Sequence, residues 1–390
     1  MHVPSRHDFL LEPGLVFLNH GSFGAVPRRV HEASETLRLD MERNPVEWLG
    51  RRSDELLEGA RRRLASFVGA HHDDLVFFPN PTTAINMVVQ SLRLPAGSEI
   101  LTTDHEYGAM VRTWHKWCNE HELAYRPVQL PDPLPTPDEV ADIIWSAVTE
   151  RTRVLFISHI TSSTAVRLPV EQLCQRAREA GILTIVDGAH VPNHVPLDLA
   201  TLGADVYTGA LHKWLCAPKG ASFLHATPAV QEWLQPLVVS WGWESDVPSH
   251  SRFIDHHQWQ GTRDLTPFLA VPAAIDFVES HDWDVVRSEG HRRVIEARDR
   301  VDGLTGLAPL APDGDQWLGQ MAAIRLPDPV DVSLLQTHLR ERCRIEVPCH
   351  RWNGQPLMRV SATAHTTDDD IDALVDAMPT ALRAAGSVTS

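Results

Sequence analysis

The stretch "VYTGALHKWLCAPKG" at residues 206–220 places Lys213 in a small, apolar run directly after a buried strand. An isolated lysine is ordinarily exposed to solvent. At the end of a buried strand it can instead lie in a cleft, provided that other strands bring suitable partners to the same edge of the sheet. The segments on both sides of this stretch therefore decide what Lys213 can do.

Strands and helices alternate along the first two thirds of the chain. Apolar segments such as 74–79, 183–190 and 221–226 are separated by helical ones such as 80–92 and 169–181. This alternation predicts a mostly parallel α/β sheet covered by helices on both faces. The segments from residue 320 onward follow the order strand, helix, strand, strand, helix, which predicts a smaller α+β domain. We expect an N-terminal segment at 1–20 that contributes to the active site and the small domain, a large domain at 21–265 and a small domain at 266–390.

Composition excludes several classes of partner. The 390 residues hold 35 Lys and Arg against 51 Asp and Glu, a net charge of -16, which argues against nucleic acid and anionic membranes. No apolar run approaches the roughly 18 residues of a membrane span, and the first residues lack a signal-peptide pattern. The five cysteines are scattered without a C-x-x-C pair, and no histidine pair has metal-ligand spacing. We expect a cytoplasmic protein without a metal, nucleic acid or membrane partner.

Polar clusters follow the predicted strands at "NPTT" (80–83), "DHEY" (104–107), "VDGAH" (186–190) and "LHK" (211–213). The carboxyl ends of parallel strands meet at one edge of a sheet. Asp187 and Lys213 suit pyridoxal phosphate there, because the lysine can form a Schiff base while the carboxylate keeps the pyridine nitrogen protonated. "NPTT" opens a helix and offers backbone N–H groups and hydroxyls to a phosphate.

Eight segments in order resemble the class V aminotransferase family of fold-type-I pyridoxal-phosphate enzymes, most closely its isopenicillin N epimerase-like subfamily. They are "FLNHGSFGAVP", "NPTTAINMVVQSL", "DHEYGAM", "SHITSSTAVRLPV", "VDGAH", "HKWLCAPKG", "QGTRDLTPFLA" and "RVSATAHTTDDDID". They begin at residue 17 and cover nearly the whole chain. The resemblance implies a sheet of the seven-stranded type in the large domain and an amino-acid substrate.

The resemblance also implies roles for individual residues. Lys213 would form the Schiff base and move the proton at Cα, Asp187 would pair with the pyridinium nitrogen, and His190 would approach the phenolic oxygen of the ring. Tyr107 would stack on the cofactor, with His105 as the alternative. Either side chain, or a bridging water, could act as the second acid on the face opposite the lysine.

The phosphate and substrate groups follow from the same resemblance. Thr82, Thr83 and His212 would hold the phosphate, and Thr262 would reach the phosphate of a neighbouring subunit, which implies a homodimer with shared active sites. Arg359 would bind the substrate α-carboxylate, a role suited to its planar fork. The remaining substrate-binding candidates are Asn19, His20, Ser22 and Arg263.

The sequence departs from the family pattern at two positions. Ala210 stands where relatives carry a phosphate-binding serine, which predicts weaker cofactor retention unless Thr208 replaces the hydroxyl. Ser162 stands near the ring oxygen, where desulfurase-like relatives carry asparagine, and the epimerase-like branch favours a small hydroxyl there.

The branch of the reaction stays open. The resemblance favours an epimerase of natural-product biosynthesis that acts at Cα of an amino acid. The alternatives are a C–S lyase or decarboxylative deaminase acting on an S-substituted cysteine, an aminotransferase, a cysteine desulfurase that uses Cys349, and a non-catalytic binding protein. Ala210 is the one feature that favours the last of these.

Overall fold

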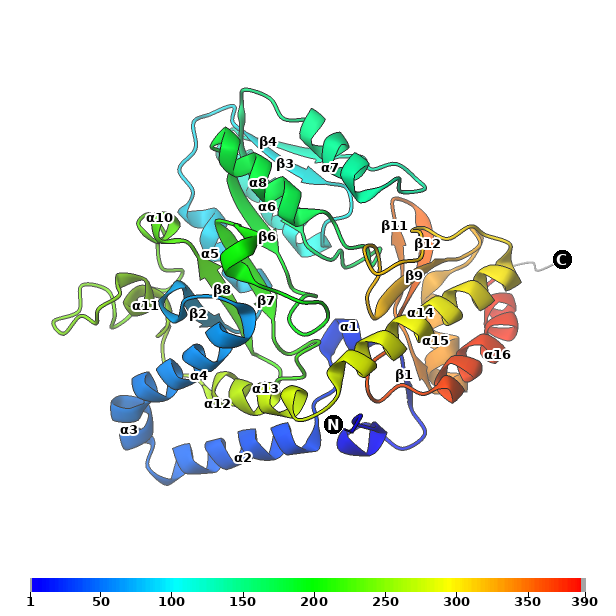
Figure 1. Ribbon diagram of the computed structural model, residues 1–390, viewed down its shortest axis with the longest axis horizontal. Coiled ribbons are helices and arrows are strands. Elements are labelled where there is room, and N and C mark those ends of the chain that lie inside the picture. Colours follow the sequence, from blue (N-terminus) through cyan, green and yellow to red (C-terminus); the bar gives the residue numbers. More distant parts are fainter. Residues whose placement is uncertain (1, 387–390) are drawn as a thin grey trace.

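A seven-stranded sheet forms the core of the larger lobe (Figure 1). Its strand order is β2-β8-β7-β6-β5-β3-β4, and only β8 is antiparallel to its neighbours. The computed structural model describes residues 2–386. The strands are β2 (Leu75–Phe78), β3 (Glu99–Thr103), β4 (Ala124–Val128), β5 (Thr152–Ser158), β6 (Leu183–Asp187), β7 (Val206–Ala210) and β8 (Ser222–Ala226). The predicted mostly parallel α/β sheet is confirmed.

Helices cover both faces of this sheet because its strands are buried on both sides. In β2, Phe77 packs into one apolar core and Phe78 into another, as the two-residue period of a strand requires. α5 (Pro81–Ser91) and α6 (Gly108–Glu120) contribute to the core that holds Phe78. The core that holds Phe77 takes side chains from α4 (Ser53–Val68), α7 (Pro137–Ser146) and α8 (Val170–Ala180).

The edge strand β4 was not among the predicted strands. All five of its residues are partly or fully exposed, and it contains Pro127. Proline is tolerated in edge strands, where its missing N–H leaves no ladder bond unmade. The segment therefore lacks the apolar run that revealed the interior strands.

The smaller lobe has a three-stranded antiparallel sheet in the order β11-β12-β9. The strands are β9 (Met321–Arg325), β11 (Cys349–Trp352) and β12 (Gln355–Ser361), and the helices are α14 (Trp283–Thr305), α15 (Val332–Cys343) and α16 (Asp368–Ala384). The first of the two consecutive strands expected in this domain, at residues 344–350, is divided into β10 (Ile345–Glu346) and β11. Pro348 lies between them and cannot donate a ladder hydrogen bond.

Two helices after residue 265 pack against the larger lobe. They are α12 (Thr266–Leu269) and α13 (Val271–Glu279), which contact α2 (Arg28–Arg43) and α4. Both helices fall within the range 266–390 that was expected to form the small domain. None of the helices in residues 2–386 is long and apolar enough to cross a membrane.

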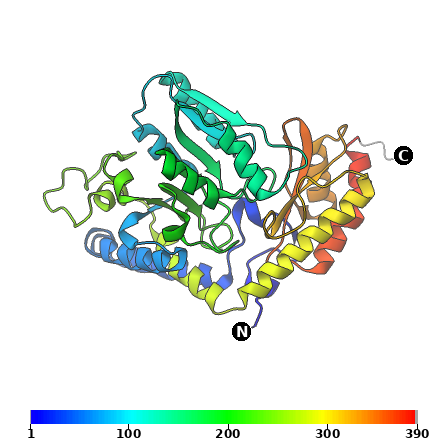
Figure 2. The same ribbon diagram turned by 45° about the horizontal axis from the view of Figure 1, so that its top comes forward.

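The N-terminal segment joins the smaller lobe and then enters the space between the lobes (Figure 2). β1 (Val16–Phe17) pairs in parallel with β10, and the Ser361 N–H donates to the Leu18 carbonyl at 2.9 Å. The chain then turns into α1 (His20–Phe23), near the carboxyl ends of the large sheet. Residues from the start of the chain thus reach the candidate site.

Candidate active site

A pocket of about 180 Å³ lies at the carboxyl ends of β5, β6 and β7. Among the predicted site residues, it is lined by Ser22, Thr82, Tyr107, Ser162, Asp187, His190, His212 and Lys213. Phe23, Asn80, Pro81, Ser158, Ile160 and Ala189 complete the lining. The strand-end clusters therefore meet in one pocket.

The amine of Lys213 is buried, and its ammonium form loses a proton unusually easily. Burial, together with the positive charge of Arg359, lowers the pKa of Lys213 to about 7. Its Nζ lies 3.1 Å from Nε2 of His190, and the Trp214 indole N–H donates to Nδ1 of His190 at 3.4 Å. Burial holds the pKa of His190 well below its usual value, so this ring is neutral. With Nδ1 as acceptor, the proton is assigned to Nε2, which donates to the lone pair of the amine.

Asp187 ends β6 at the floor of the pocket. Its Oδ1 accepts a hydrogen bond from the Ala189 N–H at 3.0 Å, and no cation forms an ion pair with it within residues 2–386. Burial raises its pKa, whereas the nearby Lys213 charge lowers it. A cationic N–H in the pocket would stabilise the ionised carboxylate.

The N-terminus of α5 faces the pocket, and only one of the two predicted phosphate-binding threonines lines it. Asn80 caps the helix, and its Oδ1 accepts from both the Thr83 N–H at 2.8 Å and the Thr83 hydroxyl at 3.0 Å. The Thr83 hydroxyl is thus used within the cap, whereas Thr82 lines the pocket. His212 lies nearby with Nδ1 2.9 Å from the Ala221 carbonyl, and burial lowers its pKa to about 4.

Arg359 projects from β12 and is 5% exposed. Its Nη2 donates to the Ser22 hydroxyl at 2.9 Å, and its Nη1 donates to the Ser162 hydroxyl at 3.2 Å. Burial lowers its pKa to about 10. No carboxylate pairs with it in the described part of the chain. Since a buried cation without an anion is costly, this guanidinium is suited to bind a carboxylate that enters the pocket.

The structure does not bring His105 into the pocket. This side chain is 1% exposed, its Nδ1 lies 2.7 Å from the Thr164 hydroxyl, and its ring packs on Trp352 with centroids 4.4 Å apart. Tyr107, two residues later, lines the pocket and is 45% exposed. Of the two alternatives for the cofactor face, the geometry favours Tyr107.

Thr208 does not supply the hydroxyl missing at Ala210. Its Oγ1 donates to the Phe223 carbonyl at 2.7 Å, between β7 and β8. Both Thr208 and Ala210 are fully buried, and neither lines the pocket. The hydroxyl of Thr208 is committed to the sheet because the register pairs β7 with β8 at this point.

The remaining candidates lie around the pocket. Asn19 Oδ1 accepts from the Ser22 hydroxyl at 2.5 Å. His20 lies behind the lysine, with Nε2 3.1 Å from the Lys213 carbonyl, so it supports the backbone there. Arg263 donates to the Gln258 carbonyl at 3.1 Å, and Thr262 is exposed. The last two do not reach the pocket of their own chain.

Sequence reasoning missed Glu106 and Ser158. The Glu106 carboxyl accepts from the N–H and the hydroxyl of Ser158, and Ser158 lines the pocket. The available signal was a carboxyl next to Tyr107 in "DHEY", at the end of a buried strand.

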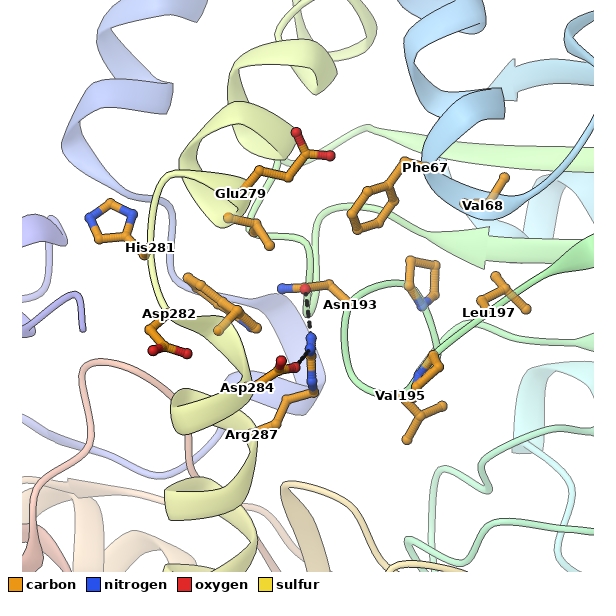
Figure 3. Close-up of a pocket in the computed structure, with 14 residues that line it drawn as sticks. Phe67, Val68, Asn193, Val195, Leu197, Glu279, His281, Asp282, Asp284 and Arg287 are labelled. Carbon is orange, nitrogen blue, oxygen red and sulfur yellow. Dashed lines mark hydrogen bonds and ion pairs between the residues drawn. The ribbon is translucent and has the colours of Figure 1, made fainter. Parts of the chain in front are cut away.

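A larger cavity of about 450 Å³ is lined by the later part of the loop that follows β6 and by the start of α14 (Figure 3). Arg287 donates to Asn193 Oδ1 at 3.4 Å and pairs with Asp284. The Asn193 amide in turn donates to the Trp214 carbonyl at 2.9 Å. Because this lining contains neither Lys213 nor Asp187, the smaller pocket is the candidate active site.

One group of possible metal ligands lies on the surface. His71, His72 and Asp73 bring ligand atoms within 4.8 Å of one another. The Asp73 carboxylate lies 3.0 Å from His250 Nε2, so another side chain already contacts it.

The aminotransferase class-V family model matches residues 17–374. The chain is 40% identical over 386 residues to an isopenicillin N epimerase of Amycolatopsis lactamdurans, covering 96% of this chain and 97% of that protein. It is 38% identical to an isopenicillin N epimerase of Streptomyces clavuligerus, covering 96% of each chain. Among solved structures, a mutant of C-DES with glycine linked to its pyridoxal-phosphate cofactor has a TM-score of 0.85 at 19% identity, covering 96% of this chain and 98% of that one.

The chain therefore belongs to the aminotransferase class-V family of pyridoxal-phosphate enzymes. Within that family it is an isopenicillin N epimerase-like enzyme. This membership confirms the predicted family, the enzyme class and the cofactor. The C-DES likeness confirms the predicted fold.

Proposed function

We propose that the protein is a pyridoxal-phosphate-dependent epimerase that inverts Cα of an amino-acid substrate of the isopenicillin N type, in the biosynthesis of a natural product. The observation that carries this proposal is a pocket lined by Lys213 and Asp187, beside which the unpaired Arg359 donates to the lining residues Ser22 and Ser162. The similarity to two isopenicillin N epimerases over nearly the whole chain supports the choice of reaction.

The pocket fits the cofactor. Lys213 would hold it covalently, Asp187 would hold the ring nitrogen, and Thr82 with the N-terminus of α5 would hold the phosphate. When bound, pyridoxal phosphate acts as an electron sink that acidifies the Cα–H bond of an attached amino acid. His190 contacts Nζ of the lysine, so it would orient the amine before the cofactor arrives.

The substrate groups follow from the positions of the polar side chains. Arg359, held by Ser22 and Ser162, would bind the α-carboxylate and thereby fix the direction of the Cα–H bond. An amine with a pKa of about 7 can accept a proton and return it at neutral pH. The Tyr107 hydroxyl is our candidate for the proton on the opposite face of Cα.

The test compares wild type with Lys213→Ala, and with Lys116→Ala as a control. Lys116 is exposed and pairs with Glu120 on α6. Wild type and Lys116→Ala should show a visible absorption band and exchange the Cα proton of the substrate with solvent deuterium without a keto product. Lys213→Ala should lose both. A colourless wild type would contradict the enzyme, and pyruvate with thiol from S-alkylcysteines would show a C–S lyase instead.

We also propose a homodimer with shared active sites. Thr262 is exposed and lies outside the pocket of its own chain. Four large apolar side chains between α10 (Pro228–Gln231) and α11 (Arg252–His257) are exposed, in a loop that projects from the larger lobe (Figure 1). They are Val238, Val239, Trp241 and Val247. Burial of such side chains would stabilise a dimer.

Mixed dimers test the sharing. The dimer to be tested has one Lys213→Ala subunit and one Thr262→Val subunit. If Thr262 crosses to the partner, the site that keeps native Lys213 receives native Thr262 from the Lys213→Ala subunit, so one site has both native residues. Mixing and reassociating the two variants should then restore activity above that of either variant alone. A monomer by light scattering, or no restoration in a confirmed mixed dimer, would contradict the proposal.

The proposed location is the cytoplasm. All five cysteines are present as free thiols. Oxidising compartments favour disulfides, so this thiol content supports a reducing one. Cell fractionation with a specific antibody tests it.

A further inference from the structure

A second buried carboxyl lies next to the pocket. Glu106 belongs to the turn between β3 and α6, and it is 5% exposed. Its Oε2 accepts from the Ser158 N–H at 2.9 Å and from the Ser158 hydroxyl at 2.6 Å, and its Oε1 accepts from the Thr103 hydroxyl at 2.7 Å. No cation pairs with it among residues 2–386. Three donors thus fix the carboxyl in one orientation.

Ser158 connects this carboxyl to Asp187. The two residues are register partners on the parallel strands β5 and β6, and both line the pocket. Partners in register point to the same face of a sheet, about 5 Å apart. Because the Ser158 hydroxyl donates to Glu106, it presents its lone pairs to the pocket. The orientation of this hydroxyl therefore depends on Glu106.

We propose that Glu106 is a positioning residue of the active site, which orients the Ser158 hydroxyl and adds a second negative charge behind Asp187, so that Asp187 holds the ring nitrogen of the cofactor more strongly. This inference rests on the proposed function for its cofactor. Glu106 itself does not line the pocket, so it acts through Ser158 and through its charge.

The charge on Glu106 changes near neutral pH. Burial is the main cause that raises its pKa to about 7, and the neighbouring Asp187 adds to the effect. The titratable groups that face it are Asp187 from β6 and Tyr125 from β4. The side-chain donors are hydroxyls that can also accept, so the protonated acid keeps its partners. The extra charge is present above about pH 7 and absent below it.

The test is the affinity of the apoprotein for pyridoxal phosphate, measured in wild type and Glu106→Gln at about pH 6 and about pH 8.5. Glutamine keeps an acceptor for the Ser158 N–H and remains uncharged. The two proteins should bind with similar affinity at the lower pH, where wild-type Glu106 is also neutral. At the higher pH the variant should bind about tenfold more weakly, which corresponds to one pKa unit of interaction.

Asp302→Asn is the matched control. Burial also raises the pKa of Asp302, to about 6, but this residue lies on α14 outside the pocket lining. Its variant should bind the cofactor like wild type at both pH values. An equal loss for Glu106→Gln at both pH values would show a structural role alone, and no loss at either would overturn the proposal.

Thr103→Val provides a second variant in case Glu106→Gln does not fold. It removes one donor to the ionised carboxyl, so the pKa of Glu106 should rise and the pH at which affinity changes should move upward. An unmoved midpoint would overturn the inference.

Urea unfolding of the apoproteins needs no cofactor. The pKa of Glu106 is raised in the folded state, so its contribution to stability is lost as pH rises from about 4.5 through 7, and Glu106→Gln should remove this decline. A wild type that binds no pyridoxal phosphate refutes the proposed function and this inference with it. The inference alone fails if wild type is active while the variants show no pH-dependent difference.

Discussion

Replacing Arg359 tests the most specific consequence of the site geometry. Arg359→Gln removes a buried cation whose hydrogen bonds within residues 2–386 go to Ser22 and Ser162 and whose carboxylate partner would be the substrate. Two hydrogen bonds to a charged group contribute about 1.5 kcal/mol each at the low end of their range, or about 3 kcal/mol together. We therefore expect kcat/KM to fall about 150-fold. In Arg359→Lys, which keeps the charge without the planar fork, kcat/KM should fall less.

The assay compares an α-carboxylate substrate with its carboxamide in wild type and Arg359→Gln. Wild type should prefer the carboxylate by about the same factor that the mutation costs, and the variant should lose this preference, which isolates the pairwise interaction. Arg351→Gln is the control, because Arg351 is exposed on β11 and donates to backbone carbonyls. If Arg359→Gln kept the preference for the carboxylate, the assigned role would be wrong.

Three further substitutions test the pocket. Lys213→Met should abolish activity yet raise the stability of the apoprotein near pH 7, measured by urea unfolding. The folded-state pKa of Lys213, about 7, lies below the usual 10.5, so the wild type loses stability as pH falls through that interval. A less stable variant would contradict this reasoning. Cys349→Ser should leave activity unchanged, since burial raises the pKa of that thiol to about 12 and a thiol is a poor nucleophile; loss of sulfur transfer from cysteine would indicate a desulfurase. Ala210→Ser should tighten cofactor binding about threefold, the gain of one modest hydrogen bond, and fluorescence titration showing equal or weaker binding would count against the missing-hydroxyl interpretation.

The sequence predicted those pocket residues that lie at the ends of strands. Asp187 ends β6 and Lys213 follows β7, and these two strands pair in parallel, so the rule for parallel sheets placed the two residues together before any contact was known. The same rule cannot tell which residue of a turn faces the pocket. Whether His105 or Tyr107 does so depends on Trp352, which packs on the histidine from a strand far along the chain.

Local hydrogen bonds explain the other differences. Thr83 was expected at the phosphate, but its hydroxyl bonds to the Asn80 cap, a competition that the sequence "NPTT" does not resolve. Thr208 was an open alternative, and its hydroxyl bonds across the sheet to a strand whose register was unknown. The domain boundaries and the role of Thr262 at a partner's phosphate stay predictions.

The pairing of β1 with β10 has a consequence for the order in which the protein folds during synthesis. Ser22 and Phe23 line the pocket, yet the segment that leads to them is held by residues 345, 346 and 361. Most of the chain must leave the ribosome before those partners exist, and contacts between such distant residues form late. A nascent chain that already contains Lys213 therefore still lacks one wall of its active site, and cofactor captured at that stage would be held without it.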